Sequence, residues 1–464
     1  MLQDFITSRI ISELPFTPNQ EQHELIKELS DFLVDTSIQK IFLLRGYAGT
    51  GKTSIVSALV KAMRTLEHKN ILLAPTGRAA KVIASYSSMP AFTIHKKIYR
   101  QFRMDDFRFG LTDNLHTHTL FVVDEASMIS NNASENSAFG TGRLLDDLIE
   151  YVYAGHQCSL LLLGDVAQLP PVHQENSPAL DLDFMEGYGL DLHHFTLTQV
   201  ARQALESGIL HNATQLRTCI SDHRVYDMPN FDVSGFADIK KIDGQEMLEE
   251  IQQAYDTMGE ENTIVITRSN KRANLYNQGI RARIMWKEDE ISNGDMVMVT
   301  RNNYFWTKEY DGIDFLANGD MFSIVRISKY RELYGMRFAD VSLQSLDYDW
   351  EIDTTVLLDS IYTENPNKNY ELSNLLFQRI AEDYPEIRNR KELVKTIMAN
   401  PYFNALHIKF AYAVTCHKAQ GGQWKNVFID QGMINDDMLG MDYYRWLYTA
   451  ITRATERVFL INFE

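Results

Sequence analysis

Eight consecutive residues constrain the fold of this chain more than any other segment. Residues 46–53 read GYAGTGKT, the apolar run IFLL precedes them at 41–44, and an amphipathic helix is predicted at 52–66. A G-x-x-x-x-G-K-[S/T] loop between a buried strand and a helix gathers backbone N–H groups and a helix N-terminus around one point. Such a loop encloses phosphate oxygens, and strand–loop–helix units of this kind build parallel α/β sheets.

The residues of this loop predict a triphosphate site with a divalent cation. The glycines let the backbone approach the phosphates, Lys52 supplies a cation for the β- and γ-phosphates, and Thr53 supplies a hydroxyl ligand to Mg²⁺. The other expected nucleotide contacts are Gly46, Ala48, Gly49, Thr50 and Gly51. A glycine-rich turn without a ligand is the alternative, which the flanking strand and helix disfavour.

Two carboxylates follow another apolar run. Residues 121–123 read FVV, and Asp124 and Glu125 come directly after them. Asp124 is placed to hold Mg²⁺, through a water molecule, and Glu125 is placed to orient or deprotonate an attacking water. Such a pair alone is often a surface turn. Combined with the phosphate loop, it favours an ATPase over a kinase for small molecules, which needs no hydrolytic carboxylate.

Short apolar runs alternate with helical patterns along the chain, which predicts an α/β fold with parallel sheets. The runs lie at residues 41–44, 71–74, 120–123, 160–163, 263–267, 427–430 and 458–463. Near residue 290 this rhythm gives way to turn signals and alternating polar and apolar residues, and it returns near 407. We expect a first domain at 1–200 and a second at 201–464, interrupted at 290–406 by a small β unit with a helical extension.

Composition excludes other classes of protein. The chain has 464 residues, of which 45% are hydrophobic and 23% charged, as in soluble globular proteins. It has no apolar run long enough to span a membrane and no signal-peptide pattern. Its three scattered cysteines fit a reducing, cytoplasmic compartment. The net charge of −17 argues against a general polyanion binder, although an acidic protein can contain a local basic groove.

Five further segments resemble sequence motifs of the superfamily 1 helicases and occur in the order of that family. They read APTGRAA at 74–80, TIH at 93–95, LLLGDVAQLPPV at 161–172, YAVTCHKAQG at 412–421 and YTAITRA at 448–454. Their wording is similar to that of the RecD-like branch, and the layout of the chain resembles that of Dda-type phage helicases. The resemblance is weakest in the inserted unit.

This resemblance implies two RecA-like parallel-sheet domains, with a small SH3-like β insertion in the second and a short pin insertion at 96–119 in the first. It implies an ATP-dependent helicase or translocase that moves 5′ to 3′ on single-stranded DNA and couples ATP hydrolysis in the interdomain cleft to duplex unwinding. ATP and Mg²⁺ are the implied cofactors. Single-stranded DNA, forked duplex DNA and replication or repair proteins are the implied partners of a monomeric protein without a membrane partner.

Two other functions stay open at this point. An RNA-directed relative is one, because phosphate and stacking contacts do not exclude a 2′-hydroxyl. The other is a nucleotide-switched recruitment subunit that binds DNA without unwinding it.

The resemblance also assigns residues to the nucleotide site. Gln20 matches a glutamine that contacts adenine, and the alternative is an exposed Gln20 in a helix capped by Thr17. Gln168 matches the residue that senses the γ-phosphate. Arg202 and Arg453 match two arginine fingers, because a guanidinium presents forked donors and permanent charge to the transferred phosphoryl group. For Arg202 the alternative is a surface salt bridge.

Contacts to DNA are assigned in the same way. The expected ones are Thr76, Arg78, Thr93 and His95 in the first domain and Thr415, His417, Lys418 and Gln420 in the second. In the pin segment, Phe107 or Phe109 would stack on the last base pair of a fork. The alternatives are buried, hydrogen-bonded histidines at 95 and 417 and core aromatic residues at 107 and 109.

Overall fold

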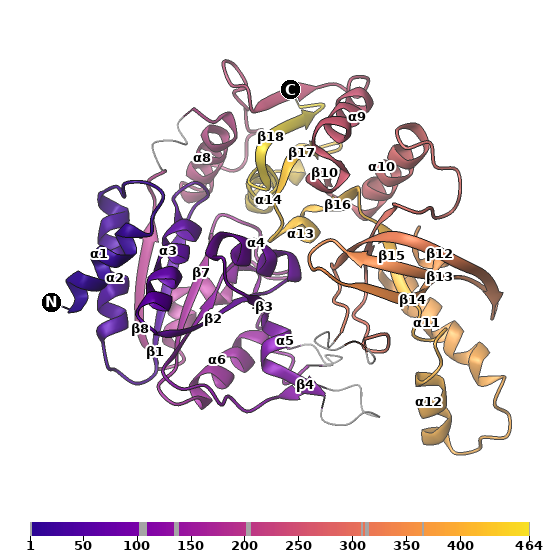
Figure 1. The fold of residues 1–464 in the computed structure, drawn as a ribbon. Helices are drawn as coiled ribbons and strands as arrows, with labels where there is room; N and C mark the ends of the chain where they lie inside the picture. Colours follow the sequence, from indigo (N-terminus) through magenta and orange to yellow (C-terminus); the bar gives the residue numbers. More distant parts are fainter. Residues whose placement is uncertain are drawn as a thin grey trace. The chain divides into compact units, whose positions relative to one another are not determined.

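The apolar runs of the sequence form the central strands of two sheets in the computed structural model (Figure 1). In the first sheet the strands stand in the order β3-β2-β6-β7-β1-β8, and every neighbouring pair is parallel. In the second the order is β16-β10-β17-β18-β9, and β10 is parallel to both of its neighbours. The predicted α/β class with two parallel-sheet domains is therefore confirmed.

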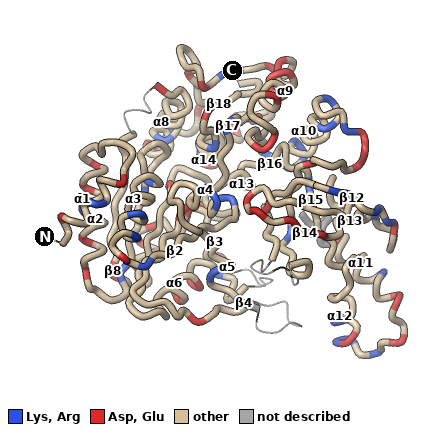
Figure 2. The backbone as a smooth tube through the Cα atoms, viewed as in Figure 1, with Lys and Arg blue, Asp and Glu red and all other residues tan. Residues whose placement is uncertain are grey.

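The structure describes residues 2–463 apart from 102–108, 134–138, 201–205, 308–309, 311–314 and 364–365. Lysine and arginine are interspersed with aspartate and glutamate along this trace, so the net charge of −17 is not confined to one segment (Figure 2). Among the described residues, no helix is both long enough and apolar enough to cross a lipid bilayer.

The first sheet is held by a core shared with the helices before and after the glycine-rich loop. Its strands are β1 (Lys40–Gly46), β2 (Lys69–Ala74), β3 (Ala91–Thr93), β6 (Thr119–Val123), β7 (Ser159–Gly164) and β8 (Asp191–Leu197). The helices in this part of the chain are α1 (Leu2–Ser12), α2 (Gln20–Val34), α3 (Lys52–Thr65), α4 (Gly77–Ser87), α5 (Ile94–Ile98), α6 (Leu144–Ala154) and α7 (Leu182–Glu186). Apolar side chains of α1, α2 and α3 pack with Phe42 and Leu44 of β1 and with Leu161 and Leu163 of β7.

A short antiparallel hairpin occupies the predicted pin segment. Strand β4 (Tyr99–Gln101) pairs with β5 (Phe109–Leu111). The residues that join the two strands lie outside the described part of the chain, so the tip of the pin stays a prediction.

A closed barrel of five strands and a pair of helices form the inserted unit. The strands are β11 (Met296–Val299), β12 (Met321–Leu333), β13 (Met336–Ser345), β14 (Glu351–Leu357) and β15 (Leu406–Phe410), and the helices are α11 (Pro366–Ala381) and α12 (Arg390–Met398). Apolar residues of the two helices pack on Met336, Phe338 and Leu357 of the barrel. The β unit with a helical extension was expected here, whereas its SH3-like character stays a prediction.

The remaining elements surround the second sheet or precede its strands. The strands are β9 (Ile239–Ile242), β10 (Thr263–Thr267), β16 (Ala413–Thr415), β17 (Trp424–Asp430) and β18 (Ala454–Ile461). The helices are α8 (Gly208–Ser221), α9 (Met247–Met258), α10 (Asn270–Arg283), α13 (Cys416–Ala419) and α14 (Met441–Ile451).

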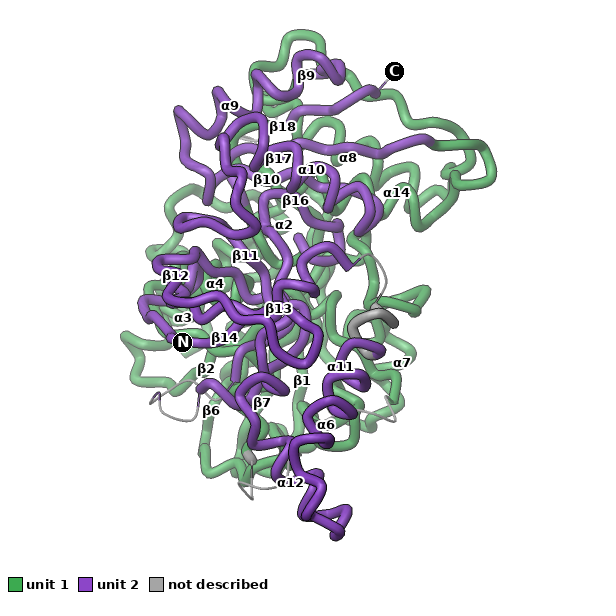
Figure 3. Tube along the Cα trace, turned by 90° about the vertical axis from the view of Figure 1, so that its right-hand side faces the viewer, with its two compact units in different colours: residues 1–240, 420–423, 434–457 green, residues 241–419, 424–433, 458–464 purple. Residues whose placement is uncertain are grey.

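Contacts divide the chain into two units (Figure 3). The first unit comprises Met1–Lys240, Gln420–Gln423 and Ile434–Arg457, and the second comprises Lys241–Ala419, Trp424–Met433 and Val458–Glu464. Helices α8 and α14, which follow residue 200 in the sequence, thus pack with the first unit. The expected division into domains at 1–200 and 201–464 stays a prediction.

A buried carboxylate ties the barrel to α10 within the second unit. Asp295, just before β11, is 0% exposed and accepts hydrogen bonds from Arg281 Nε and Nη2 at 3.1 and 3.0 Å. Lys287 Nζ and the Tyr412 hydroxyl donate to it as well, each at 3.0 Å. Because Arg281 is also buried, loss of its partner would leave an uncompensated charge away from water.

We therefore expect Asp295→Asn to lower the free energy of unfolding by about 3–5 kcal/mol. Urea denaturation followed by circular dichroism measures this value. The control is Asp222→Asn, which removes a carboxylate from an exposed pair with Arg224 and should leave the stability almost unchanged. Equal stability of the two variants would contradict a structural role for the Asp295 network.

Candidate active site

The glycine-rich loop connects the carboxyl end of β1 to the start of α3, as the sequence predicts. Gly49 and Gly51 have φ angles of 74° and 90°, in the left-handed region that glycine adopts without strain. A Cβ atom at Gly46 would lie 3.1 Å from Cβ of Leu197 and 2.9 Å from the Lys52 side chain. The loop therefore wraps closely around the N-terminus of α3, where backbone N–H groups lack partners within the helix.

A cleft of about 360 Å³ lies over this loop, within the first unit. This volume is in the range of small-molecule sites. The predicted nucleotide residues that line it are Ala48, Gly49, Gly51, Lys52, Thr53, Asp124, Glu125, Gln168 and Arg453. The structure thus brings together side chains from four segments that lie far apart in the sequence.

The Lys52 ammonium is anchored to the loop itself. Its Nζ atom donates hydrogen bonds to the carbonyl oxygens of Gly46 and Tyr47, at 2.7 and 2.8 Å. The cation is consequently held beside the backbone N–H groups, and both favour an anion at the same place.

Asp124 and Glu125 follow β6 at the wall of the cleft. Burial, and then the neighbouring Glu125 carboxylate, raise the pKa of Asp124 to about 7. Glu125 has a φ angle of 53°, unusual for a residue with a side chain, and its backbone N–H donates to Asp124 Oδ1 at 2.8 Å. Two crowded carboxylates beside the Thr53 hydroxyl are a donor set that suits a hard divalent cation, whose charge would stabilise both.

Arg453 faces Glu125 across the cleft wall. The guanidinium group is 4% exposed, and its Nη1 atom lies 3.5 Å from Glu125 Oε1. Its Nε donates to the Thr449 carbonyl at 3.1 Å, and Nη1 also reaches the Gly422 carbonyl at 3.4 Å. A buried, permanently charged group is therefore fixed next to the carboxylate predicted to act on water.

The loop after β7 supplies Asp165 and Gln168. Asp165 is 1% exposed, and its burial raises the pKa of its carboxyl group. The side chain of Gln168 is buried, and its Oε1 atom has no hydrogen-bond partner among the described residues. Because buried polar atoms are almost always paired, an unpaired one at the cleft is a candidate ligand contact.

Two family models match opposite ends of the chain. One, described as an AAA domain, matches residues 17–224, and the other, described as a UvrD-like helicase C-terminal domain, matches residues 410–461. The ATP-dependent RecD2 DNA helicase of Deinococcus radiodurans is 23% identical over 95% of this chain and 50% of its own length. The ATP-dependent DNA helicase dda of Enterobacteria phage T4 is 24% identical over 90% of this chain and 93% of its own.

Together, these matches support a superfamily 1 helicase of the RecD and Dda type. The chain spans half the length of the RecD2 relative. A solved structure of Pif1 helicase from Bacteroides in complex with ADP-AlF3 and single-stranded DNA is 14% identical, covering 97% of this chain and 93% of that one, with a TM-score of 0.45. The strand order of the two sheets defines the fold of this chain.

One residue that contacts the glycine-rich loop, Gln22, is absent from the sequence predictions. It forms a capping box with Asn19 at the start of α2, is 2% exposed, and donates from Nε2 to the Thr50 carbonyl at 2.9 Å. The predicted Gln20 is exposed instead and donates to Glu24 at 3.0 Å. The signal for Gln22 is the spacing Asn19-x-x-Gln22. Whether Gln20 contacts adenine stays a prediction.

Several predicted DNA contacts of the first unit have structural partners. Thr76 and Thr93 cap α4 and α5, accepting from backbone N–H groups at 3.2 and 3.1 Å. Gln420 is buried, and its side-chain amide donates to the Leu169 carbonyl at 2.7 Å. Burial lowers the pKa of His95 to about 4, so its ring is neutral near pH 7. Their roles toward DNA stay predictions, as does that of the partly buried Arg78.

Three other predicted positions bear on the pin and the arginine fingers. Phe109 is 5% exposed, and its ring centroid lies 5.1 Å from that of Phe139. This burial fits the core alternative better than a stacking role. Phe107 and Arg202 lie outside the described residues.

In the second unit, the predicted DNA contacts lie at the carboxyl end of β16 and in α13. Thr415 is the last residue of β16, His417 is exposed, and Lys418 donates to the Asn318 side chain. Burial, and then the charge of Lys409, lower the pKa of Lys418 to about 8.

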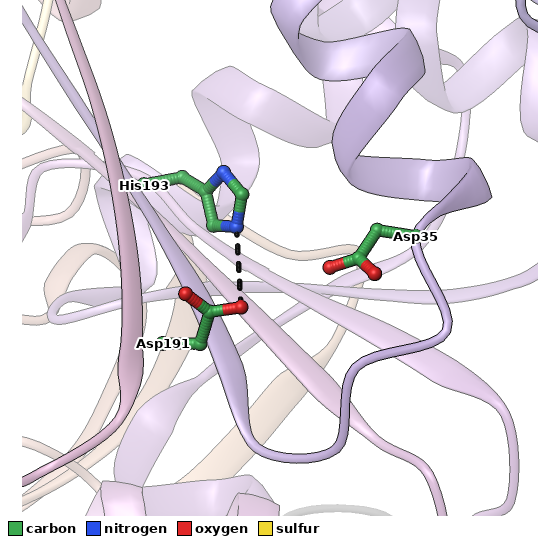
Figure 4. Close-up of side chains that lie close together, drawn as sticks. All are labelled: Asp35, Asp191 and His193. Atoms are coloured by element: carbon green, nitrogen blue, oxygen red, sulfur yellow. Dashed lines mark ion pairs between the residues drawn. The ribbon is translucent and has the colours of Figure 1, made fainter.

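A separate group of charged side chains lies between α2 and β8 (Figure 4). Atoms of Asp35, Asp191 and His193 that could bind a metal lie within 4.8 Å of one another. However, the Asp35 carboxylate already accepts from Ser37 N and Oγ at 3.0 and 2.8 Å, and the Lys40 ammonium contacts the Asp35 carbonyl. Within this group, His193 Nε2 lies 3.5 Å from Asp191 Oδ2, the pair drawn in Figure 4. We interpret the group as a structural cluster in which these side chains already have partners within the protein.

Gln22→Ala should weaken nucleotide binding about tenfold, or about 1.4 kcal/mol, because it leaves the Thr50 carbonyl and the Asn19 N–H without their partner. Titration with a fluorescent ATP analogue measures the dissociation constant. Gln20→Ala is the matched control on the same helix. Equal affinity of Gln22→Ala and wild type would contradict the supporting role, and weaker ATP but unchanged GTP binding in Gln20→Ala would favour its contact with adenine.

Proposed function

We propose that this chain is an ATP-dependent DNA helicase that moves 5′ to 3′ along single-stranded DNA. The observation that carries the proposal is the cleft of the first unit, which Lys52, Glu125 and Arg453 line together. A phosphate-binding loop, a carboxylate for water and a buried guanidinium are the parts that NTP hydrolysis requires. The names of the RecD2 and Dda relatives support the choice of DNA as the track, and the direction rests on the resemblance of the motifs.

In this proposal the first unit carries out hydrolysis. Glu125 orients the attacking water or removes its proton, and Arg453 stabilises charge on the transferred phosphoryl group, an effect of about 10³–10⁵ in rate in other NTPases. Thr53 and Asp124 would hold Mg²⁺, which neutralises phosphate charge when it is bound.

The connectivity of the chain supports coupling between hydrolysis and movement. Arg453 directly precedes β18, and residues 420–423 directly precede β17, both strands of the second sheet. A displacement of Arg453 or of the Gly422 carbonyl at the cleft is therefore passed along the backbone into that sheet. Coupling of this kind lets the nucleotide state change the grip on DNA.

Strand displacement on forked substrates tests this function. Forks with a 5′ or a 3′ single-stranded tail, made of DNA or of RNA, are incubated with the protein with and without ATP. We expect displacement only from forks with a 5′ DNA tail and only with ATP, and ATP turnover that rises with single-stranded DNA. Displacement from 3′ tails would refute the direction, preference for RNA would favour the RNA-directed alternative, and turnover without displacement would favour the recruitment subunit.

Glu125→Gln is the inactive control, and its ATP affinity and ATP turnover are measured beside strand displacement. The variant should bind ATP with unchanged affinity and lose about 10²–10⁴ in turnover, because the amide cannot accept the proton of water.

Lys418 should make DNA affinity depend on pH if it contacts phosphate. Because its pKa is lowered to about 8, its ammonium is charged at pH 7 and neutral at pH 9. We expect the affinity of wild type for single-stranded DNA to fall between these pH values, and the slope of log K against log salt to decrease by about one unit. Fluorescence anisotropy measures both. Lys418→Arg keeps its charge at pH 9, so an equal decrease in this variant would rule out Lys418 as the titrating group.

A further inference from the structure

The hydroxyl group of Tyr448, on α14, links two loops of the candidate active site. Tyr448 is 0% exposed. The N–H of Ala48, in the glycine-rich loop, donates to this hydroxyl at 2.8 Å, and the hydroxyl donates to Asp165 Oδ2 at 2.6 Å. The second distance is that of a hydrogen bond to a charged acceptor. One buried oxygen thus joins the phosphate loop to the loop after β7.

The direction of this hydrogen-bond chain is fixed. The Ala48 amide can only donate, so the tyrosine oxygen must accept from it and direct its own proton to the carboxylate. Burial, and then the charge of Asp165, raise the pKa of Tyr448 well above its ordinary value, so the phenol keeps that proton. Asp165 is held further by the Ala167 N–H at 2.9 Å.

The neighbouring residue of α14 holds the other end of the same loop. The Leu169 N–H donates to Thr449 Oγ1 at 2.8 Å, and the Leu169 carbonyl accepts from Gln420 at 2.7 Å. Gln168 lies in the sequence between Asp165, which Tyr448 holds, and Leu169, which Thr449 holds. It has the buried, unpaired Oε1 atom at the cleft. Its position therefore depends on Tyr448 at one side and on Thr449 at the other.

We propose that Tyr448 is a positioning residue for ATP hydrolysis, which fixes the Gln168 loop relative to the phosphate loop through Asp165. This role rests on the proposed hydrolase function. Tyr448 does not contact the nucleotide in this role, so it governs turnover rather than affinity. A tyrosine that only fills the core would need its ring and not its hydroxyl.

Tyr448→Phe separates the two roles, because it keeps the ring and removes only the hydroxyl. We expect the kcat of ATP hydrolysis stimulated by single-stranded DNA to fall at least tenfold, while KM for ATP changes less than about threefold. Tyr444→Phe is the matched control, because the Tyr444 hydroxyl on the same helix donates to the Asp227 carbonyl at 2.7 Å and Tyr444 does not line the cleft. Both of its constants should equal those of wild type.

A double-mutant cycle tests the path through Asp165. Asp165→Asn and Tyr448→Phe should each lower kcat, and the double variant should be no slower than the slower single variant, since both changes break the same link. Additive losses would overturn the proposed path. Wild-type kcat in Tyr448→Phe, or a change confined to KM, would overturn the positioning role.

Thr449→Val guards against a folding defect. It removes the hydroxyl that accepts from Leu169 at nearly constant volume and should lower kcat with little change in KM, as Tyr448→Phe does. If Tyr448→Phe does not fold, an unchanged kcat in folded Asp165→Asn would refute the proposal, and an unchanged kcat in folded Thr449→Val would remove the second anchor of the loop. Absence of ATP turnover in wild type would refute the hydrolase function itself, whereas wild-type turnover with unaffected variants would refute only the positioning role.

Discussion

Parallel pairing of β6, β7 and β1 is the constraint on which the candidate site depends. These strands are neighbours in the first sheet, and parallel strands bring their carboxyl ends to one edge. Asp124 follows β6, Asp165 follows β7, and the glycine-rich loop follows β1. Three polar segments separated by long stretches of sequence therefore meet because of strand order, before any side-chain contact is considered.

That convergence places like charges together, and the rest of the site compensates for them. Burial raises the pKa of Asp124 and Asp165, and the negative charge of Glu125 raises both further. Lys52 and Arg453 oppose this effect on Asp124 through their positive charge. Arg453 comes from near the end of the chain, within residues 434–457 of the first unit. Its attraction to the carboxylates at the edge of the first sheet favours the packing of this segment with the first unit.

The sequence predicts this site well where one local pattern determines the structure. The apolar runs identify β1, β6 and β7, and the glycine spacing identifies the loop between β1 and α3. Strand β8 is not predicted, because DLHHFTL at 191–197 has few apolar residues and pairs only with β1 at the edge of the sheet. Gln22 is missed because two cap patterns overlap, Thr17-x-x-Gln20 and Asn19-x-x-Gln22. The hydrogen bond from Gln22 to the Thr50 carbonyl, a long-range contact, accompanies the second pattern.

The hydrogen bonds of Tyr448 lie beyond prediction from sequence for a different reason. They join residues 400 and 283 positions apart. The YTAITRA segment at 448–454 includes Tyr448 but not Tyr443 or Tyr444, yet nothing in it shows that the Tyr448 hydroxyl reaches Ala48 and Asp165. Only the packed structure shows which of the three hydroxyl groups contacts residues that line the cleft. A motif can therefore mark a residue without showing the long-range contact through which it acts.

Charge pairing explains how an acidic chain could follow a polyanion. In the second unit, arginines are committed to carboxylates of the same unit, in the pairs Arg272–Asp430, Arg281–Asp295, Arg331–Asp340 and Arg337–Asp359. Apart from the candidate contacts Arg78 and Lys418, phosphate contacts would then be made by hydroxyl groups, amides and helix N-termini, which hold a backbone without reading its sequence. Such neutral contacts are individually weak. A protein that must release a strand at every step gains from weak contacts, because strong ion pairs at each phosphate would slow that release.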